Sequence, residues 1–164
     1  MIGRSGLSLT TLVALAGIAR AAGCDAVDQS FLLVQNLPAW EQRVTMTPPG
    51  KPASTIDMIT MGDVVYMKMG GGPWRKQPMP AAQRKAMTTQ MMKTMAPSDC
   101  TLVGRESVGG TPATVYAFRQ PDVTKKGTIL DVKMWIDADG LPLKSESAAN
   151  QTLFYYTGVA APIP

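Results

Sequence analysis

The chain has 164 residues, of which 45% are hydrophobic and 17% are charged, and this composition is typical of one globular domain that is long enough to bury a core. The formal net charge is only +4, and the basic residues form scattered pairs that we interpret as solvated surface rather than as a nucleic-acid-binding stripe: Arg75–Lys76, Arg84–Lys85 and Lys125–Lys126. Histidine is absent, which excludes Ser-His and Cys-His nucleophile pairs, a histidine general base and a His-ligated zinc site, so we predict a protein that is not an enzyme and has no cofactor or metal.

The N-terminal segment has the features of an export signal. A basic start is followed by an apolar run, Leu7–Ile18, and by small residues at Ala19 and Ala21 in the spacing that signal peptidase prefers. The run is too short to remain as a membrane span. We predict a signal peptide over residues 1–22, a single domain over residues 23–164, and a periplasmic location for the mature protein.

Cys24 has two interpretations that the sequence leaves open. An exported protein with two cysteines usually pairs them, which favours a disulfide to Cys100. Such a bridge would attach the N-terminal helix to the middle of the sheet. The run Ala21–Cys24 is also close to a bacterial lipobox, so the alternative is a lipid anchor on Cys24, and Cys100 would then be a lone thiol.

The first half of the domain reads as one helix and a set of strands. Apolar residues recur at helical spacing over Asp25–Leu37, and Pro38 ends the segment. Alternating patterns then predict three strands and a short edge segment: Trp40–Thr47, Ser54–Met61, Val64–Met69 and Pro73–Lys76.

A second helix is predicted over Pro80–Met95, with methionines four residues apart on one stripe at Met87, Met91 and Met95. Five more strands follow in the order Leu102–Ser107, Thr114–Arg119, Ile129–Asp137, Leu141–Ser147 and Gln151–Tyr156. The last three form a meander in which alternation places Val132, Met134 and Ile136 on one face.

This element order predicts an α+β fold: a mostly antiparallel sheet of about nine strands with two covering helices. A twisted sheet of that width seldom stays flat, so we expect it to curve strongly or to close in part.

Several motifs resemble the outer-membrane lipoprotein carrier superfamily, the LolA-like and LppX-like periplasmic proteins. They lie in the last strands and in the middle hairpin: Val132–Asp137, Gly140–Lys144, Tyr155–Pro162, Val64–Met67 and Pro73–Trp74. The resemblance implies a half-barrel of antiparallel strands covered by helices. It also implies that acyl chains or other hydrophobic cargo are held between the concave sheet and its helical lid.

The methionine content is compatible with such a role, because flexible methionine side chains adapt to irregular apolar ligands. The chain has 12 methionines, most of them between Met46 and Met95. We predict a non-enzymatic binding protein for a hydrophobic or lipid-like ligand. We expect membrane association only if Cys24 is lipidated. The predicted ligand-binding residues are Met67, Met69, Trp74, Met87, Met91 and Met134.

Other functions remain open at this point. The methionine stripe can be ordinary core packing, and thioether sulfurs can also bind Cu(I). The same scaffold with a filled core can serve as an envelope protein-interaction or stress-sensing module, with a partner docked on the sheet edge near Gly70–Trp74.

Overall fold

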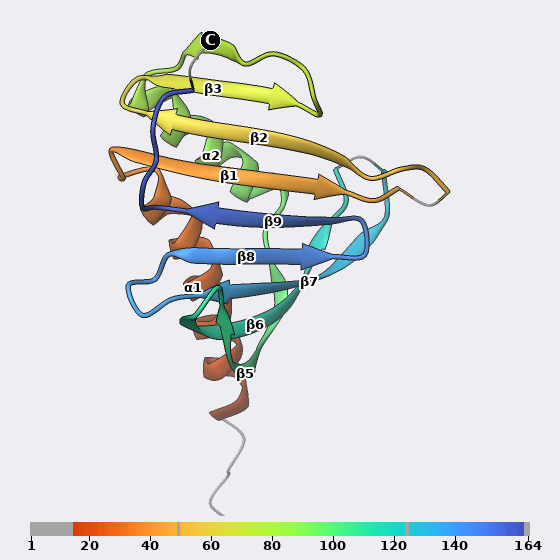
Figure 1. Ribbon diagram of the computed structural model, residues 1–164. Coiled ribbons are helices and arrows are strands. Elements are labelled where there is room, and N and C mark those ends of the chain that lie inside the picture. The colour runs from red at the N-terminus through yellow and green to blue at the C-terminus, as the bar shows by residue number, and fades with distance from the viewer. Residues whose placement is uncertain (1–14, 49, 124, 163–164) are drawn as a thin grey trace, which may run out of the picture.

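The computed structural model describes residues 15–48, 50–123 and 125–162, and for residues 15–22 it describes the backbone only. Within these residues the chain forms two helices and one sheet of nine strands (Figure 1). No helix in these ranges is long and apolar enough to cross a membrane.

The elements follow one another in nearly the order that the sequence predicts. They are α1 (Leu15–Val34), β1 (Ala39–Met46), β2 (Ser54–Met61), β3 (Val64–Met69), β4 (Arg75–Pro78), α2 (Ala81–Thr94), β5 (Ser98–Val108), β6 (Thr111–Pro121), β7 (Ile129–Ile136), β8 (Pro142–Ser147) and β9 (Asn150–Tyr155). Every strand pair is antiparallel, and the spatial order is β4-β3-β2-β1-β9-β8-β7-β6-β5.

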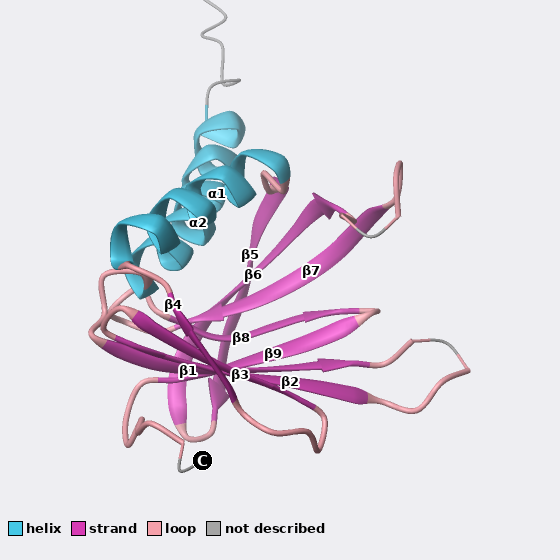
Figure 2. Ribbon diagram, turned by 90° about the horizontal axis from the view of Figure 1, so that it is seen from above, coloured by secondary structure: helices cyan, strands magenta, loops and turns pink. Residues whose placement is uncertain are grey.

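The sheet is strongly curved and stays open, because β4 and β5 form its two edges without pairing with each other. Both helices lie side by side on the concave side of the sheet (Figure 2). This arrangement confirms the predicted α+β half-barrel with two covering helices.

The first helix differs most from its predicted range. Its backbone is helical from Leu15, so it runs through position 22, where the predicted signal peptide ends, while residues 1–14 lie outside the described part of the chain. Signal cleavage therefore stays a prediction. The helix ends at Val34, before the predicted Leu37, because a tight turn begins there: the N–H of Leu37 donates to the Val34 carbonyl at 3.1 Å.

The main core lies under α1 and not under α2. Val27 of α1 packs on the buried face of the meander, where Val132, Met134 and Ile136 point inward as the alternation predicts. Phe118 of β6 completes this cluster. The half of the sheet formed by β5 to β8 is therefore filled with side chains.

A smaller cluster lies on the other face of the same strands. It contains Trp135, Val115 and Leu143. The indole Nε1 of Trp135 donates to Glu106 Oε2 at 2.8 Å, and the ammonium of Lys144 lies 4.4 Å from the ring centroid. Trp135 is thus a structural residue of the outer face.

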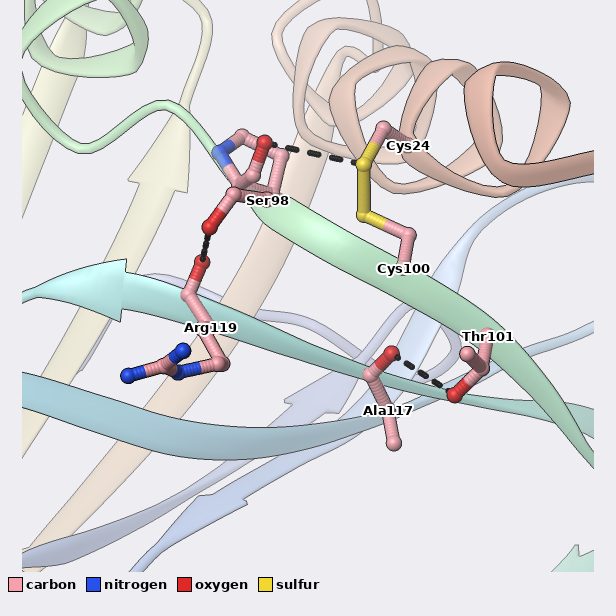
Figure 3. Close-up of a disulfide and its surroundings, with 7 residues drawn as sticks. Cys24, Ser98, Cys100, Thr101, Ala117 and Arg119 are labelled. Atoms are coloured by element: carbon pink, nitrogen blue, oxygen red, sulfur yellow. Dashed lines mark hydrogen bonds between the residues drawn. A yellow bond between two sulfur atoms is a disulfide. The ribbon is translucent and has the colours of Figure 1, made fainter. Parts of the chain in front are cut away.

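The disulfide between Cys24 and Cys100 is present, and it joins residues 76 positions apart (Figure 3). It uses the Cys24 sulfur that a lipid anchor would need, so the disulfide interpretation is confirmed. The expectation that it reaches the middle of the sheet is wrong, because Cys100 belongs to β5, which is an edge strand.

A bulge in β5 orients Cys100 toward the helix. The pairing register with β6 shifts between Ser98 and Thr101, and Asp99 within this shift adopts a positive φ of 53°. Hydrogen bonds from Ser98 and Thr101 to carbonyls of β6 hold the strand on both sides of the bulge (Figure 3). On the helix, Gly23 allows close approach, because an added Cβ would lie 3.3 Å from Cys100 Cβ.

Candidate ligand-binding cavity

The half of the sheet that α2 covers is hollow. A cavity of about 870 Å³ lies between the concave face of β1 to β4 and β9 and the two helices. This volume falls within the roughly 300–1,000 Å³ that is typical of small-molecule sites. A second cavity of about 190 Å³ shares Phe31, Gln42, Met91 and Phe154 with the first and extends toward β6 and β8.

The floor of the cavity is built by residues in register across five neighbouring strands. Phe154 of β9 pairs with Gln42 of β1, which pairs with Met58 of β2, Met67 of β3 and then Arg75 of β4. All five line the cavity. Because side chains alternate between the two faces of a strand, this row fixes which residues of β1, β2, β3 and β9 face the cavity. In the edge strand β4, the consecutive residues Arg75, Lys76 and Gln77 all line it.

Four of the six predicted ligand-binding residues line the cavity: Met67, Met69, Met87 and Met91. The two sheet residues and the two α2 residues lie on opposite walls. Their exposed fractions range from 36% for Met67 to 66% for Met69. These side chains are therefore not packed into a closed core, and ligand binding by them stays a prediction.

Met134 and Trp74 lie elsewhere. Met134 is fully buried under α1, where the hydroxyl of Ser30 lies 3.4 Å from its sulfur. The Trp74 ring contacts the ammonium of Lys68 at 5.0 Å, and Lys68 pairs with Asp57 on the face opposite the cavity. Neither residue is part of the cavity wall.

The wall also contains residues that the sequence analysis did not single out. Phe31 and Val34 of α1, Trp40 of β1 and Arg84 of α2 all line the cavity. The helical spacing of Phe31 and Val34 indicated an inward face, but not which part of the sheet it faces. For α2, the spacing of Arg84 with Met87 and Met91 places these residues on one side of the helix.

The burial of Arg84 contradicts the prediction that the Arg84–Lys85 pair belongs to the solvated surface. Lys85 is exposed, but Arg84 is buried. The Arg84 guanidinium donates to the carbonyl oxygens of Gly62 at 2.6 Å and Met79 at 2.7 Å. These acceptors lie in the β2–β3 turn and just before α2, so the burial of Arg84 depends on tertiary contacts.

Among the described residues that line the cavity there is no Asp, Glu or Cys side chain. In the described ranges, no group of three or more His, Cys, Asp or Glu side chains comes together as a metal site. The cavity wall is mainly apolar, with amide, hydroxyl and basic groups at a few positions. This arrangement is suited to binding by desolvation of apolar surface.

Fold and cavity together define an open half-barrel whose concave face and covering helices enclose an apolar hollow. This is the fold that the sequence resemblance to LppX-like proteins implies, and it is similar to the folds of the solved structures of LprF and LppX. A scan of protein-family models and a search of curated proteins find no match to the chain.

Three solved structures illustrate the likeness. LprF from Mycobacterium bovis has a TM-score of 0.53 and 13% identity, over 88% of this chain and 96% of that chain. The Mycobacterium tuberculosis lipoprotein LppX has a TM-score of 0.52 and 13% identity, over 88% and 98%. A chain from the MucA/MucB complex of Pseudomonas aeruginosa has a TM-score of 0.51 and 17% identity, over 85% and 59%. At these identities the comparison establishes the fold.

Proposed function

We propose that the protein is an exported, non-enzymatic binding protein that holds a hydrophobic or lipid-like ligand in the cavity between the sheet and α2. The observation that carries this proposal is the 870 Å³ cavity, whose wall contains methionines that solvent reaches. A filled core would leave no such apolar surface accessible inside the half-barrel.

The binding energy would come from apolar burial. Each buried CH₂ group contributes about 0.8 kcal/mol, so an acyl chain gains several kcal/mol without a specific hydrogen bond. Met67 and Met69 on the sheet and Met87 and Met91 on α2 would adapt to the chain, because methionine has several rotatable bonds and a polarizable sulfur.

Release of the ligand would require α2 to move as a lid. The N-terminal end of α2 is attached to the sheet, because Asp63 Oδ1 in the β2–β3 turn accepts the N–H of Ala81 at 3.0 Å. The cavity-facing part of the helix carries Met87 and Met91, which have no closed packing. Opening would therefore turn the helix about its N-terminal end.

The direct test changes the apolar wall on α2. We expect Met87→Gln/Met91→Gln to weaken binding of a fluorescent long-chain alcohol roughly tenfold or more, because two apolar contacts of about 1 kcal/mol each are lost. Ala86→Gln is the matched control, since Ala86 is exposed on the same helix and does not line the cavity. Retention of full affinity with only reduced stability in urea would exclude the cavity as the ligand site.

Intact-mass spectrometry of protein from its native envelope tests export and cargo together. We expect a mass that lacks the predicted signal peptide and two protons for the disulfide, with a heavier native species that releases a lipid. A single clean mass under native conditions would instead favour the protein-interaction alternative.

A further inference from the structure

The cavity wall contains a buried cation whose hydrogen bonding is incomplete. Arg84 is 6% exposed and lines the cavity. One terminal nitrogen of its guanidinium donates to the two carbonyls described above, but the buried Nε has no hydrogen-bond partner in the described part of the chain. Leaving a buried charged donor unpaired is costly, and native proteins rarely do so without a reason.

A second residue that lines the cavity also has an unpaired donor. Trp40 is 6% exposed, and its indole Nε1 is buried without a partner among the described residues. Trp40 and Arg84 come from β1 and α2, so the sheet and the helix each contribute one lining residue that has an unpaired, buried donor. Indole and guanidinium nitrogens only donate, so the group that satisfies them must be an acceptor.

The charge of the wall indicates what kind of acceptor this is. Arg75 and Lys76 of β4 also line the cavity, and none of the described lining residues is Asp or Glu. The nearby carboxylate of Asp63 already accepts the N–H of Ala81. A wall with cations and no carboxylate favours an anionic acceptor, whose charge-assisted hydrogen bonds are stronger than neutral ones.

We propose that the cavity selects amphiphiles with an anionic oxygen headgroup, a carboxylate or a phosphate, and that Arg84 and Trp40 bind this headgroup while the methionines hold the apolar chain. The inference rests on the proposed function and adds the headgroup chemistry to it. Arg84 supplies charge and a donor, and Trp40 supplies a neutral donor. A neutral lipid also has oxygen acceptors, but it would leave the charge of Arg84 without a counterion.

The test measures headgroup preference with probes that share one chain. Dodecanoate, dodecyl phosphate and dodecanol are titrated by calorimetry at a pH where the carboxylate is ionised, and acetate and inorganic phosphate are added as competitors. The readout is the Kd of dodecanol divided by the Kd of dodecanoate, compared between wild type and variant, because this comparison cancels the different solubilities of the probes.

We expect Arg84→Gln to lower this ratio roughly ten- to hundredfold, as for the loss of a charge-assisted hydrogen bond, with little change for dodecanol. Trp40→Phe should lower it less, and it keeps the test valid if Arg84→Gln fails to fold. Lys85→Gln is the control, since it removes the neighbouring charge from the same helix but from an exposed side chain.

The outcomes are distinguishable. An unchanged ratio in both variants, with dodecanol still bound, would overturn the headgroup inference and leave the proposed function intact. No binding of any dodecyl probe by folded wild type would overturn both. Displacement of dodecanoate by millimolar acetate or inorganic phosphate would assign the donors to a free anion and would overturn selection of an amphiphile.

Discussion

Removal of the disulfide should reduce the stability of this protein by an amount that follows from its place in the chain. The bridge connects residues 76 positions apart. In the chain-entropy description, a closed loop of that length lowers the entropy of the unfolded chain enough to stabilise the native state by about 4.5 kcal/mol at 25 °C. We therefore expect Cys24→Ala/Cys100→Ala to lose about 4 kcal/mol, a large share of the 5–15 kcal/mol that is typical of a domain.

The structure adds a local effect to this entropy. Cys100 is buried in the core cluster under α1, and α1 packs mainly against β5. Without the bridge, α1 is attached to the edge strand only by side-chain packing, such as that of Val27. Alanine leaves little new space, so the loss should come mainly from the unfolded state and should raise the urea m-value.

The assay is urea unfolding followed by tryptophan fluorescence, with and without a thiol reductant. Reductant should lower the stability of wild type to that of the double variant and should not affect the variant. A loss below about 1 kcal/mol, or a variant that still responds to reductant, would refute the assignment of this stability to loop closure.

Three further predictions follow from the described contacts. Asp57→Asn should lower the free energy of unfolding in urea by about 1–3 kcal/mol, because the buried Asp57 carboxylate pairs with Arg43 at 2.5 Å and with Lys68 at 3.1 Å. The loss should not be larger, since both cations are partly exposed to solvent. An unchanged free energy of unfolding would contradict this prediction. Burial raises the pKa of the Asp57 carboxyl, but hydrogen bonds and charges from Arg43 and Lys68 outweigh it and hold the pKa below its ordinary value. The stability from this pairing is therefore present above about pH 4 and is lost as the pH falls toward the lowered pKa. The free energies of unfolding of wild type and Asp57→Asn should thus converge in acid. A difference between them that stays constant with pH would exclude this electrostatic contribution. Met134→Ala should cost about 2–5 kcal/mol because it leaves a cavity in the filled core, whereas Met69→Ala should cost well under 1 kcal/mol, and equal losses would contradict the division into a filled and a hollow half.

The two methionines of that comparison show what a local pattern can and cannot reveal. Met69 and Met134 both occupy inward positions of alternating strands, and the sequence therefore predicts the inward face for both. The structure separates them because α1 packs over β7, whereas β3 faces the cavity. Burial of one and exposure of the other depend on where the helices lie.

Arg84 shows the same division for a charged residue. Its neighbour Lys85 has the same charge and an adjacent position in the chain, and only Arg84 reaches the carbonyl of Gly62, which lies 22 residues away. No local pattern contains that contact. The bulge at Asp99, which directs Cys100 toward α1, likewise depends on pairing with β6.

Features that depend on neighbouring residues could be predicted from the sequence: the strands and their two faces, and the order of helices and strands. The count of two cysteines favoured a disulfide, but the structure was needed to choose it over a lipid anchor. Alternation and helical spacing are local, so they are legible without the fold. Which half of the sheet is filled, and which residues line the hollow, became clear from the three-dimensional packing alone. The reason is that packing and the burial of polar groups depend on contacts between segments that are distant in the chain.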